Sequence, residues 1–410
     1  MTNILIACED FRVGGAQAFT LSLAKGLQES YKYNVYIYSL YSDLIDYSFI
    51  NRIFPKAIIL SPEISGDFLI RKLDSLFRKI NIDFSLRNKI VIQNIQKTVR
   101  RYNIDLVHSN MFKSDFLFAR ALENDSSKFV ITMHGNYEEF FYNQHTGKGE
   151  IILNYNNKVI SVLERVEGLA YLTEKNLEIF NAKEFNKYFN SLNIKIKKIY
   201  NGFRIPKNSK LNNGRRQLNI PNNHTVFGMV SRGIPEKGWE TAINAFQVVN
   251  FQNKASLILV GSSPYLDKLN QKYSDDKNIH FIGYSNDPIF WTSSFDVGLL
   301  PTTFKSESLP TIIIEYLFCG KPVISTDIGE ISKMVTMDGK KAGFVLSLDS
   351  EEKVNSEEIV ECMNLYLENH QLLEKHSSLA TKAFSKFKIE KCVDEYSIIY
   401  SYILTDSGQT

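Results

Sequence analysis

Arg232 and Lys237 are cations of the types that bind phosphate groups, and they lie five residues apart in one segment. The planar guanidinium of an arginine matches phosphate oxygens in pairs, and a lysine adds a compact point charge. The segment follows an apolar run that predicts a strand, so both belong to a loop at the carboxyl end of that strand. The two side chains could therefore balance a diphosphate. Alternatively, Lys237 forms only a surface ion pair with Glu236 or Glu240.

A second chemical signal is the carboxylate of Glu315, which lies within the apolar segment 311–319. We expect a buried helix here, capped by Ser308 or Glu307, with Pro310 in its first turn. A helix start attracts anions, and Glu315 follows it by about six residues, or about 9 Å. That length is close to the reach from a nucleotide's diphosphate to its ribose, so the segment predicts a nucleotide site. Alternatively, Glu307 complements the helix dipole and Glu315 meets a buried arginine or a water.

Two further candidates lie in the first half of the chain. Gly14 and Gly15 follow the apolar run Asn3–Cys8 and precede an amphipathic helix expected over Ala18–Gln28. A strand, a glycine loop and a helix start form the geometry by which nucleotide folds approach a phosphate, although a tight turn without a ligand has the same pattern. His134 follows another apolar run. It is either a ligand-contacting histidine or one at the edge of the core, bonded to backbone.

Composition limits the class of protein. A chain of 410 residues predicts two domains or more, and a net charge of +3 is too small to indicate nucleic-acid binding. The four cysteines are far apart and match neither a disulfide framework nor a metal site, which favours a reducing compartment. The first residues lack the pattern of a signal peptide, and no apolar run is long enough to span a membrane. We therefore expect a soluble, cytoplasmic protein.

Apolar runs alternate with helical patterns throughout both halves of the chain, which predicts parallel sheets covered by helices. A polar segment over 203–223 is the best candidate for a linker between the halves. Three helices are expected at the end, over Ser356–Asn369, Gln371–Phe384 and Glu390–Leu404, before a disordered tail at 405–410. The expected strands are Asn3–Cys8, Asn34–Leu40, Ala57–Leu60, Asp105–Ser109, Phe129–Met133, Glu167–Thr173, Lys197–Tyr200, Val226–Ser231, Ser256–Gly261, His280–Gly283, Val297–Pro301, Val323–Thr326 and Gly343–Leu346.

Two segments of the first half stand out from this alternation. Leu69–Arg101 holds nine basic and two acidic residues, a local net charge of +7, with leucines at helical spacing. Such a segment can lie on an anionic membrane, although a solvated charged face has the same pattern. Glu138–Tyr155 is aromatic and polar with two glycines, and we expect a mobile loop there.

Several short motifs, taken in order, resemble those of the retaining glycosyltransferases of family 4, which are enzymes of GT-B fold. The resemblance runs from Ile4 to about Tyr402, and the order and spacing of the motifs make it specific. It is carried by Gly14-Gly15, His134-Gly135, Tyr200-Asn201-Gly202, Ser231-Arg232 with Lys237-Gly238, Leu259-Val260-Gly261, Phe281-Ile282-Gly283, the Glu307 and Glu315 pair, and Gly320 to Gly329.

The resemblance implies an α/β architecture of two Rossmann-like domains with a cleft between them. Residues 1–203 would form the acceptor domain, joined by the final helix at about 388–404, which crosses back to it. Residues 204–387 would form the domain that binds the nucleotide-sugar donor. The enzyme would move a hexose or related sugar, with retained configuration, to a glycan or lipid-linked acceptor in cell-surface polysaccharide synthesis.

The resemblance also assigns roles. Arg232 and Lys237 would bind the donor diphosphate and stabilise it as the leaving group, and Glu315 would take the ribose hydroxyls. The donor sugar would meet Glu307, the backbone near Ser308 and Leu309, and His134. Gly15 would approach the phosphate, and the loop near Tyr284 would pack by the base. The implied catalytic residues are Glu307, His134, Arg232 and Lys237; the implied donor-binding residues are Gly15, Arg232, Lys237, Tyr284, Glu307, Ser308, Leu309 and Glu315.

Two departures and two alternatives complete the sequence-based expectations. Ser308-Leu309-Pro310 replaces the glycine-rich turn of many members, so the donor sugar stays open, as does the choice between a UDP and a GDP donor. No Asp-x-Asp motif marks a metal site, so we expect a metal-independent enzyme without a cofactor. The partners expected are a nucleotide sugar, the acceptor and an anionic surface at the inner face of the plasma membrane, contacted by 69–101, but no nucleic acid. A sugar-nucleotide epimerase of the same architecture and a non-catalytic partner subunit are the alternatives.

Overall fold

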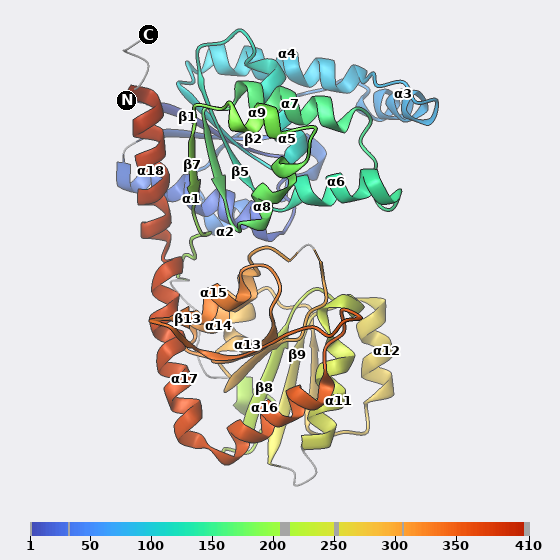
Figure 1. Ribbon diagram of the computed structural model, residues 1–410, viewed down its shortest axis with the longest axis vertical. Coiled ribbons are helices and arrows are strands. Elements are labelled where there is room, and N and C mark those ends of the chain that lie inside the picture. The colour runs from blue at the N-terminus through green and yellow to red at the C-terminus, as the bar shows by residue number, and fades with distance from the viewer. Residues whose placement is uncertain (1, 32, 206–213, 250–253, 306, 406–410) are drawn as a thin grey trace. The chain divides into compact units, whose positions relative to one another are not determined.

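The computed structural model of the protein describes residues 2–31, 33–205, 214–249, 254–305 and 307–405 (Figure 1). The chain divides into two compact units: unit 1 consists of Met1–Arg204 with Lys388–Thr410, and unit 2 of Ile205–Phe387. Each unit has its own parallel sheet with helices on both faces, as the alternating pattern predicts.

Unit 1 holds a seven-stranded parallel sheet in the order β3-β2-β1-β4-β5-β6-β7. All seven strands expected from the sequence are confirmed, with ends that move by at most two residues. Alternate residues of β1 point to opposite faces, because Leu5 and Ala7 pack into one core while Ile4 and Ile6 pack into the other. The strands are β1 Asn3–Cys8, β2 Asn34–Ser39, β3 Ile58–Leu60, β4 Leu106–Asn110, β5 Lys128–Met133, β6 Gly168–Tyr171 and β7 Lys195–Lys198.

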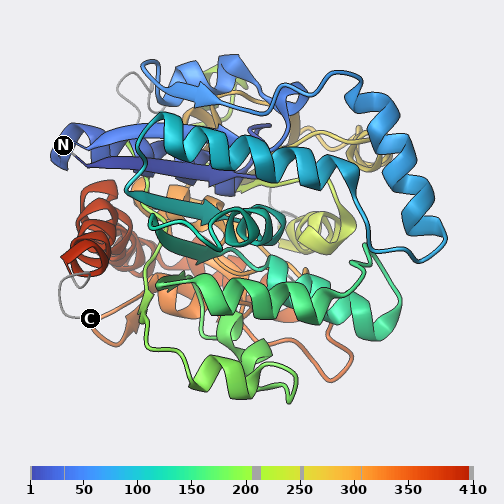
Figure 2. The ribbon, with the colours of Figure 1, turned by 90° about the horizontal axis from the view of Figure 1, so that it is seen from above.

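Helices cover both faces of this sheet, and Figure 2 shows α4 running along it while α3 lies at the margin of the unit. The longer helices are α1 Gly15–Tyr31, α2 Tyr47–Ile53, α3 Asp67–Lys79, α4 Leu86–Arg101, α5 Phe112–Ala121, α6 Asn136–Thr146, α7 Tyr155–Arg165 and α18 Ile389–Thr405. Shorter ones are η1 Ser42–Leu44, α8 Lys175–Glu178, η2 Ile179–Asn181 and α9 Asn186–Asn190.

The last helix, α18, belongs to unit 1 and packs against α1, which confirms that the chain's end returns to its first half (Figure 1). Its apolar side is buried in the core that holds β1 and α1. Polar contacts fix its position as well: the hydroxyl of Tyr400 lies 2.6 Å from Nδ1 of buried His108, and that of Tyr396 lies 2.8 Å from Oγ1 of Thr132. Buried polar pairs of this kind specify one packing arrangement.

Unit 2 holds a six-stranded parallel sheet in the order β10-β9-β8-β11-β12-β15 and a two-stranded antiparallel ribbon, β13 with β14. The six strands expected in the second half are confirmed. They are β8 Thr225–Val230, β9 Ala255–Val260, β10 Ile279–Gly283, β11 Val297–Leu300, β12 Val323–Thr326 and β15 Gly343–Leu346; the ribbon is β13 Thr336–Met337 and β14 Lys340–Lys341.

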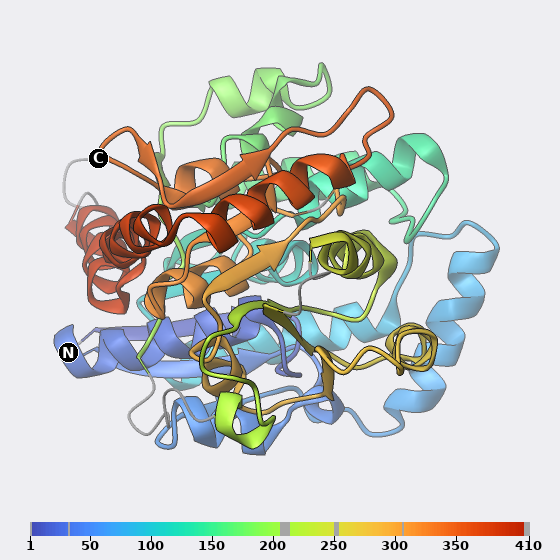
Figure 3. The ribbon, with the colours of Figure 1, turned by 90° about the horizontal axis from the view of Figure 1, so that it is seen from below.

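Figure 3 shows the helices of unit 2, where α16 packs on α11 and α17 on α14. The helices are α10 Gly214–Gln217, η3 Pro235–Lys237, α11 Trp239–Val249, α12 Pro264–Lys272, α13 Pro288–Thr292, α14 Thr311–Phe318, α15 Ile331–Val335, α16 Ser356–Glu368, α17 His370–Ala383 and η5 Phe384–Phe387. Within the described ranges, none of the helices is both long enough and apolar enough to cross a bilayer.

Three expectations need correction or fall outside the description. The mobile loop expected over Glu138–Tyr155 is wrong for its first half, because α6 occupies that half and buries Tyr137 and Phe140. Gly147, taken as a sign of a loop, ends that helix with a left-handed φ of 66°. Within the linker expected over 203–223, residues 214–217 form α10 and 206–213 lie outside the described residues. The tail expected to be disordered lies outside them from 406 onward.

Candidate functional site

Helix α14 begins at Thr311, with Pro310 as its N-cap residue, and no side chain caps it. The expectation that Ser308 or Glu307 caps this helix is therefore wrong, as is the placing of Pro310 within its first turn. Because the helix starts later than expected, Glu315 lies four residues inside it, about 6 Å along the axis rather than about 9 Å. Within the described residues no side chain caps this end of α14, although the N–H of Ile313 donates to the carbonyl of Pro310 at 3.1 Å, so the N–H groups before Ile313 are available to an anion.

Glu315 is a carboxylate without a partner. The residue as a whole is half-buried, but its Oε2 is shielded from solvent and has no hydrogen-bond partner among the described residues. Burial, followed by the negative charge of Asp287, raises the pKa of Glu315 to about 8. The buried arginine considered from the sequence is not found in the described part of the chain. A buried acceptor atom of this kind costs free energy unless a ligand supplies donors.

Lys237 and Glu307 form an ion pair, with side chains that are 7% and 10% exposed. The alternative pairing of Lys237 with Glu236 or Glu240 is therefore wrong, and Glu240 instead pairs with Lys272. Phe304 contacts both candidate cations, because Nζ of Lys237 lies 4.8 Å and Cζ of Arg232 lies 5.0 Å from its ring centre. The structure thus brings Arg232, Lys237 and Glu307 together around one aromatic ring.

Two glycines let the backbones of this cluster approach closely. Gly238 has a φ of 80°, and a Cβ there would lie 2.1 Å from the carbonyl oxygen of Pro301. Gly329 has a φ of 60°, and a Cβ there would lie 2.2 Å from the carbonyl oxygen of Glu307. Any larger residue at either position would push the Lys237 loop or the Glu307 loop out of place. The N–H of Glu330 also donates to the carbonyl of Ser308, 2.9 Å away, which holds this loop from the same side.

The remaining unit 2 candidates differ in exposure. Leu309 is buried and Ser308 is half-buried, so both form part of the turn between Glu307 and α14. Tyr284, after β10, is 64% exposed, which leaves its ring free for a planar partner. Phe304 was not predicted from the sequence: it lies three residues before Glu307, but an isolated phenylalanine has no pattern that distinguishes it from a core residue.

In unit 1, Gly15 is exposed at the first turn of α1. The loop before it is organised by Asp10, a buried carboxylate that was also missed in the sequence. It accepts hydrogen bonds from the Arg12 backbone N–H at 3.1 Å and from Gln17 Nε2 at 3.2 Å, and forms an ion pair with Arg12 at 2.6 Å. Neither Gly14 nor Gly15 has a left-handed φ. A Cβ at Gly14 would lie 2.3 Å from Oε1 of Gln17, so this glycine leaves room for the Gln17 side chain rather than providing an unusual backbone conformation.

His134 follows β5 in unit 1 and is half-buried. Its Nε2 lies 3.0 Å from Oδ1 of Asn110, and its ring packs edge-on against Phe19 at 5.4 Å. The bond to backbone considered for this residue is thus replaced by one to a side chain. Burial lowers the pKa of His134 to about 4, so the ring is neutral at pH 7. A neutral imidazole positioned in this way can hydrogen-bond a hydroxyl but carries no charge to offer a phosphate.

Acidic side chains do not gather into a metal site: in the part of the chain that the structure describes, no group of three or more His, Cys, Asp or Glu residues is arranged to hold an ion. The charges placed around the predicted phosphate position are those of Arg232 and Lys237. The free cysteines fit core packing, since Cys8, Cys362 and Cys392 are buried, and burial raises the pKa of each thiol.

Comparison with known proteins matches both units. The sequence model of glycosyl transferases group 1 matches residues 212–384, and that of glycosyltransferase family 4 matches residues 13–167. A lipopolysaccharide 1,2-N-acetylglucosaminetransferase of Salmonella typhimurium is 28% identical over 207 residues, which cover 46% of this chain and 51% of that protein. This chain thus spans about half the length of that curated relative.

Solved structures resemble the whole chain. HepE of Anabaena, in complex with UDP and glucose, superposes with a TM-score of 0.70 and 19% identity, covering 98% of this chain and all of that one. A sucrose-phosphate synthase from Thermosynechococcus elongatus has a TM-score of 0.73 and 16% identity, covering 99% of this chain and all of that one. The fold is that of the GT-B glycosyltransferases. With both sequence models matching their respective units, the chain belongs to the family of group 1 and family 4 glycosyltransferases.

Proposed function

We propose that the protein transfers a sugar from a nucleotide sugar to a glycan or lipid-linked acceptor, with retention of the anomeric configuration. The observation that carries this proposal is the buried Oε2 of Glu315, which has no partner among the described residues and lies about one turn of helix from the uncapped start of α14. Ribose hydroxyls would supply the donors that this atom lacks, while the diphosphate would accept from the free N–H groups of the helix.

The cluster of Arg232, Lys237 and Glu307 supports the transfer step. As the bond from the sugar's C1 to the diphosphate breaks, negative charge develops on the leaving phosphate, and Arg232 and Lys237 would stabilise it. The acceptor's hydroxyl oxygen would form the new bond to C1 on the same face, and its proton would pass to the leaving phosphate. Glu307 would orient the donor sugar and would not act as a nucleophile. Its ion pair with Lys237 would also hold that lysine in place. These cations would perform the role of a metal, so we propose a metal-independent reaction.

Two residues of unit 1 are also proposed as contacts of the donor. Gly15 leaves open space at the start of α1 for a phosphate, and neutral His134 could hydrogen-bond a hydroxyl of the donor sugar. Tyr284 of unit 2 offers an exposed ring to a base. HepE of Anabaena has been solved with UDP, with UDP and glucose, and with UDP-glucose. We propose that this chain also takes a UDP- or GDP-linked donor.

A membrane location is also proposed, at the inner face of the plasma membrane. The apolar stripe of α3 does not pack into the core, because Leu69, Leu73 and Leu76 are 64%, 49% and 56% exposed, and Ile80, directly after the helix, is 57% exposed. Lys72 and Lys79 lie beside it and are exposed. An exposed apolar stripe flanked by cations is the pattern of a helix that lies on an anionic bilayer.

Nucleotide binding is the first test of this function. Unfolding temperature is measured with and without UDP, GDP, CMP and ATP, each in large excess, for the wild type and for Arg232→Ala. A ligand at about 100 times its Kd stabilises the fold by about 2.7 kcal/mol, so UDP or GDP should raise the Tm and the variant should respond less. A chain that none of the four nucleotides stabilises would contradict the proposed donor site. The epimerase alternative is tested separately, because an epimerase converts the donor into an isomer without any acceptor.

A further inference from the structure

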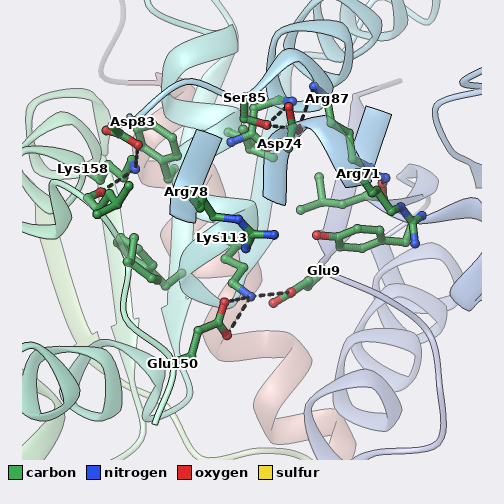
Figure 4. Close-up of a pocket in the computed structure, with 18 of the residues that line it drawn as sticks. Glu9, Arg71, Asp74, Arg78, Asp83, Ser85, Arg87, Lys113, Glu150 and Lys158 are labelled. Carbon is green, nitrogen blue, oxygen red and sulfur yellow. Dashed lines mark hydrogen bonds and ion pairs between the residues drawn. The ribbon is translucent and has the colours of Figure 1, made fainter. Parts of the chain in front are cut away.

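Unit 1 contains a cavity of about 440 Å³ at the carboxyl ends of its central strands, drawn in Figure 4. Its lining comes from the segments that follow β1 and β2, from α3, the start of α4 and the segment between them, from α5, and from α7 and the segment before it. Ligands of parallel sheets bind at this edge. All of these elements belong to one unit, and none of the donor-site residues of unit 2 lines the cavity.

Most charges in the cavity wall are paired with one another. Lys113 pairs with Glu9 at 3.4 Å and Glu150 at 2.9 Å, and Lys158 pairs with Asp83 at 2.6 Å. Figure 4 draws these interactions as dashed lines. The charges in these pairs already have partners, so they form part of the cavity wall and do not require a ligand to balance them.

The guanidinium groups of the wall are held in the same way. Arg87 donates to Asp67 at 3.0 Å and stacks over Tyr41 at 4.0 Å. Arg71 pairs with Asp43 at 2.7 Å and also with Asp67. These two aspartates lie outside Leu69–Arg101, so the local charge of that segment is partly neutralised by neighbours.

Arg78 is different. It lines the cavity and is exposed, and its guanidinium makes no hydrogen bond or ion pair with the described residues; Figure 4 draws no dashed line from it. A guanidinium presents several N–H donors in a fork that matches phosphate and carboxylate oxygens. Each of the other cations in the wall has a partner among the described residues. The Arg78 guanidinium is therefore available to bind an anionic group of a ligand.

The mouth of the cavity is apolar. Ile82, Phe84 and Ile151 all line it and are 45%, 47% and 45% exposed. More broadly, residues 68–84 hold seven of the 21 large hydrophobic side chains that are exposed in the described part of the chain. Concentrated exposed apolar surface marks an interaction site. A free cation inside and an apolar rim outside together fit a molecule with an anionic head and an aliphatic chain.

The rotation of α3 about its axis explains why the leucine stripe faces outward. Buried Asp74 accepts hydrogen bonds from the N–H groups of Leu86, at 2.8 Å, and Arg87, at 3.2 Å, in the first turn of α4. Asp67, Arg71 and Arg78 lie on the same side of the helix as Asp74, at spacings of three and four residues. The polar face of α3 thus points inward and its leucine face points outward, so a bilayer under the leucine stripe would also lie at the rim of the cavity.

We propose that this cavity binds the acceptor, and that the acceptor is an anionic amphiphile whose phosphate group meets Arg78 and whose aliphatic chain leaves over Ile82, Phe84 and Ile151. This inference rests on the proposed glycosyltransferase function and narrows its acceptor to one chemical class. Helix α3 would then have two roles: its leucine face contacts the membrane, and its polar face binds the phosphate group of the acceptor.

Titration calorimetry with three soluble probes tests the assignment: farnesyl phosphate, farnesol and inorganic phosphate. Farnesyl phosphate should bind about tenfold or more tightly than either of the others, because only it offers both the head and the chain. Arg78→Ala should weaken farnesyl phosphate binding by about tenfold or more and leave farnesol unchanged. The matched control, Arg100→Ala, removes an exposed arginine of α4 outside the cavity and should bind like the wild type. Ile82→Ser should weaken farnesyl phosphate but not phosphate, whereas Val248→Ser in unit 2 should change neither.

Competition separates an acceptor from an ordinary lipid headgroup. Vesicles of phosphatidylglycerol should bind through the leucine stripe while farnesyl phosphate still binds; complete competition would overturn the assignment of the cavity to an acceptor. Farnesyl phosphate binding no tighter than farnesol, or unchanged in Arg78→Ala, would overturn it as well. UDP and GDP titrations on the same samples keep the two proposals apart. If the protein binds a nucleotide but not farnesyl phosphate, only the assignment of the cavity to the acceptor is wrong. If it binds no nucleotide, the proposed function itself is wrong.

Discussion

At the scale of single residues, Glu315 is a carboxylate whose surroundings disfavour its charge. Its pKa lies near 8 rather than near the ordinary 4.5, because burial and Asp287 both oppose ionisation. The folded protein therefore holds this proton more tightly than the unfolded chain does, and between pH 4.5 and about 8 stability falls as pH rises. A residue that lowers the stability of the ligand-free protein and lacks a partner is typical of a ligand site.

Glu315→Gln should weaken UDP or GDP binding by about 1.5–3 kcal/mol, because an amide replaces a strong acceptor for ribose hydroxyls. The same change should stabilise the empty protein, with a gain that is near zero at pH 5, grows with pH and levels off above about pH 8. Calorimetric titration and thermal unfolding across pH 5–9 measure both effects. Glu368→Gln, an exposed carboxylate of α16, is the control. Unchanged nucleotide affinity in the folded variant would exclude the ribose role.

Arg232→Ala and Lys237→Ala should each lower turnover by about tenfold or more, because each leaves charge on the leaving phosphate unbalanced. The two variants should differ in stability. Arg232 is exposed, so its replacement should leave the Tm unchanged. Replacing buried Lys237 leaves the Glu307 carboxylate without its partner and should lower the free energy of unfolding by about 1–3 kcal/mol. Kinetics and thermal unfolding are compared with Arg216→Ala, an exposed arginine of unit 2. Normal turnover in a variant would remove that cation from the site.

At the scale of elements, the strands were predictable from the sequence, whereas helix α6 and the cap of α14 were not. Continuous apolar runs such as Asn3–Cys8 can be read directly, because both faces of a parallel sheet are buried. Helix α6 was missed because its burial depends on tertiary contacts of Tyr137 and Phe140 rather than on a periodic pattern. The cap of α14 was misassigned because Lys237, distant in sequence, binds the carboxylate of Glu307.

The sequence pointed to most residues of the candidate site but only to part of the contacts between them. The spacing of Glu307 and Glu315 and the paired cations pointed to a phosphate and a ribose. That Phe304 joins Arg232 to Lys237 depends on a loop conformation that no local sequence pattern encodes. The direction of the α3 leucines was likewise open from the sequence, because a helical stripe faces either the core or solvent, and the capping of α4 by Asp74 decides between them.

Helix α3 carries a prediction of its own. Wild-type protein should co-sediment with vesicles that contain phosphatidylglycerol, not with pure phosphatidylcholine, and binding should fall as salt rises. Replacing Leu73 and Leu76 together by Gln should remove most of the binding without lowering the Tm, because both side chains are exposed in the folded protein. Val248→Gln, an equally exposed apolar residue on α11, should bind like the wild type. Equal sedimentation with neutral and anionic vesicles, or none at low salt, would contradict the membrane role.

At the scale of the whole molecule, the chain builds unit 1 from both of its ends and unit 2 from its middle. Each unit has its own core, and α18 is part of the first. A single unfolding transition is therefore not assured, and the stability effects of Glu315→Gln and Lys237→Ala should be seen in the transition of unit 2. The division also separates the chemistry: unit 2 holds the cations and carboxylates assigned to the donor, and unit 1 holds the cavity assigned to the acceptor.

The most direct test of the central claim follows a panel of sugar nucleotides by proton NMR: UDP-glucose, UDP-galactose, UDP-N-acetylglucosamine and GDP-mannose, each incubated with the protein, with and without EDTA. The account predicts release of free UDP or GDP from at least one donor, with the sugar first appearing as the α-anomer, at a rate that EDTA leaves unchanged and that Lys237→Ala lowers by about tenfold or more. First appearance of the β-anomer, conversion of the donor to an isomer without nucleotide release, or loss of activity in EDTA with rescue by Mg²⁺ or Mn²⁺ would contradict it.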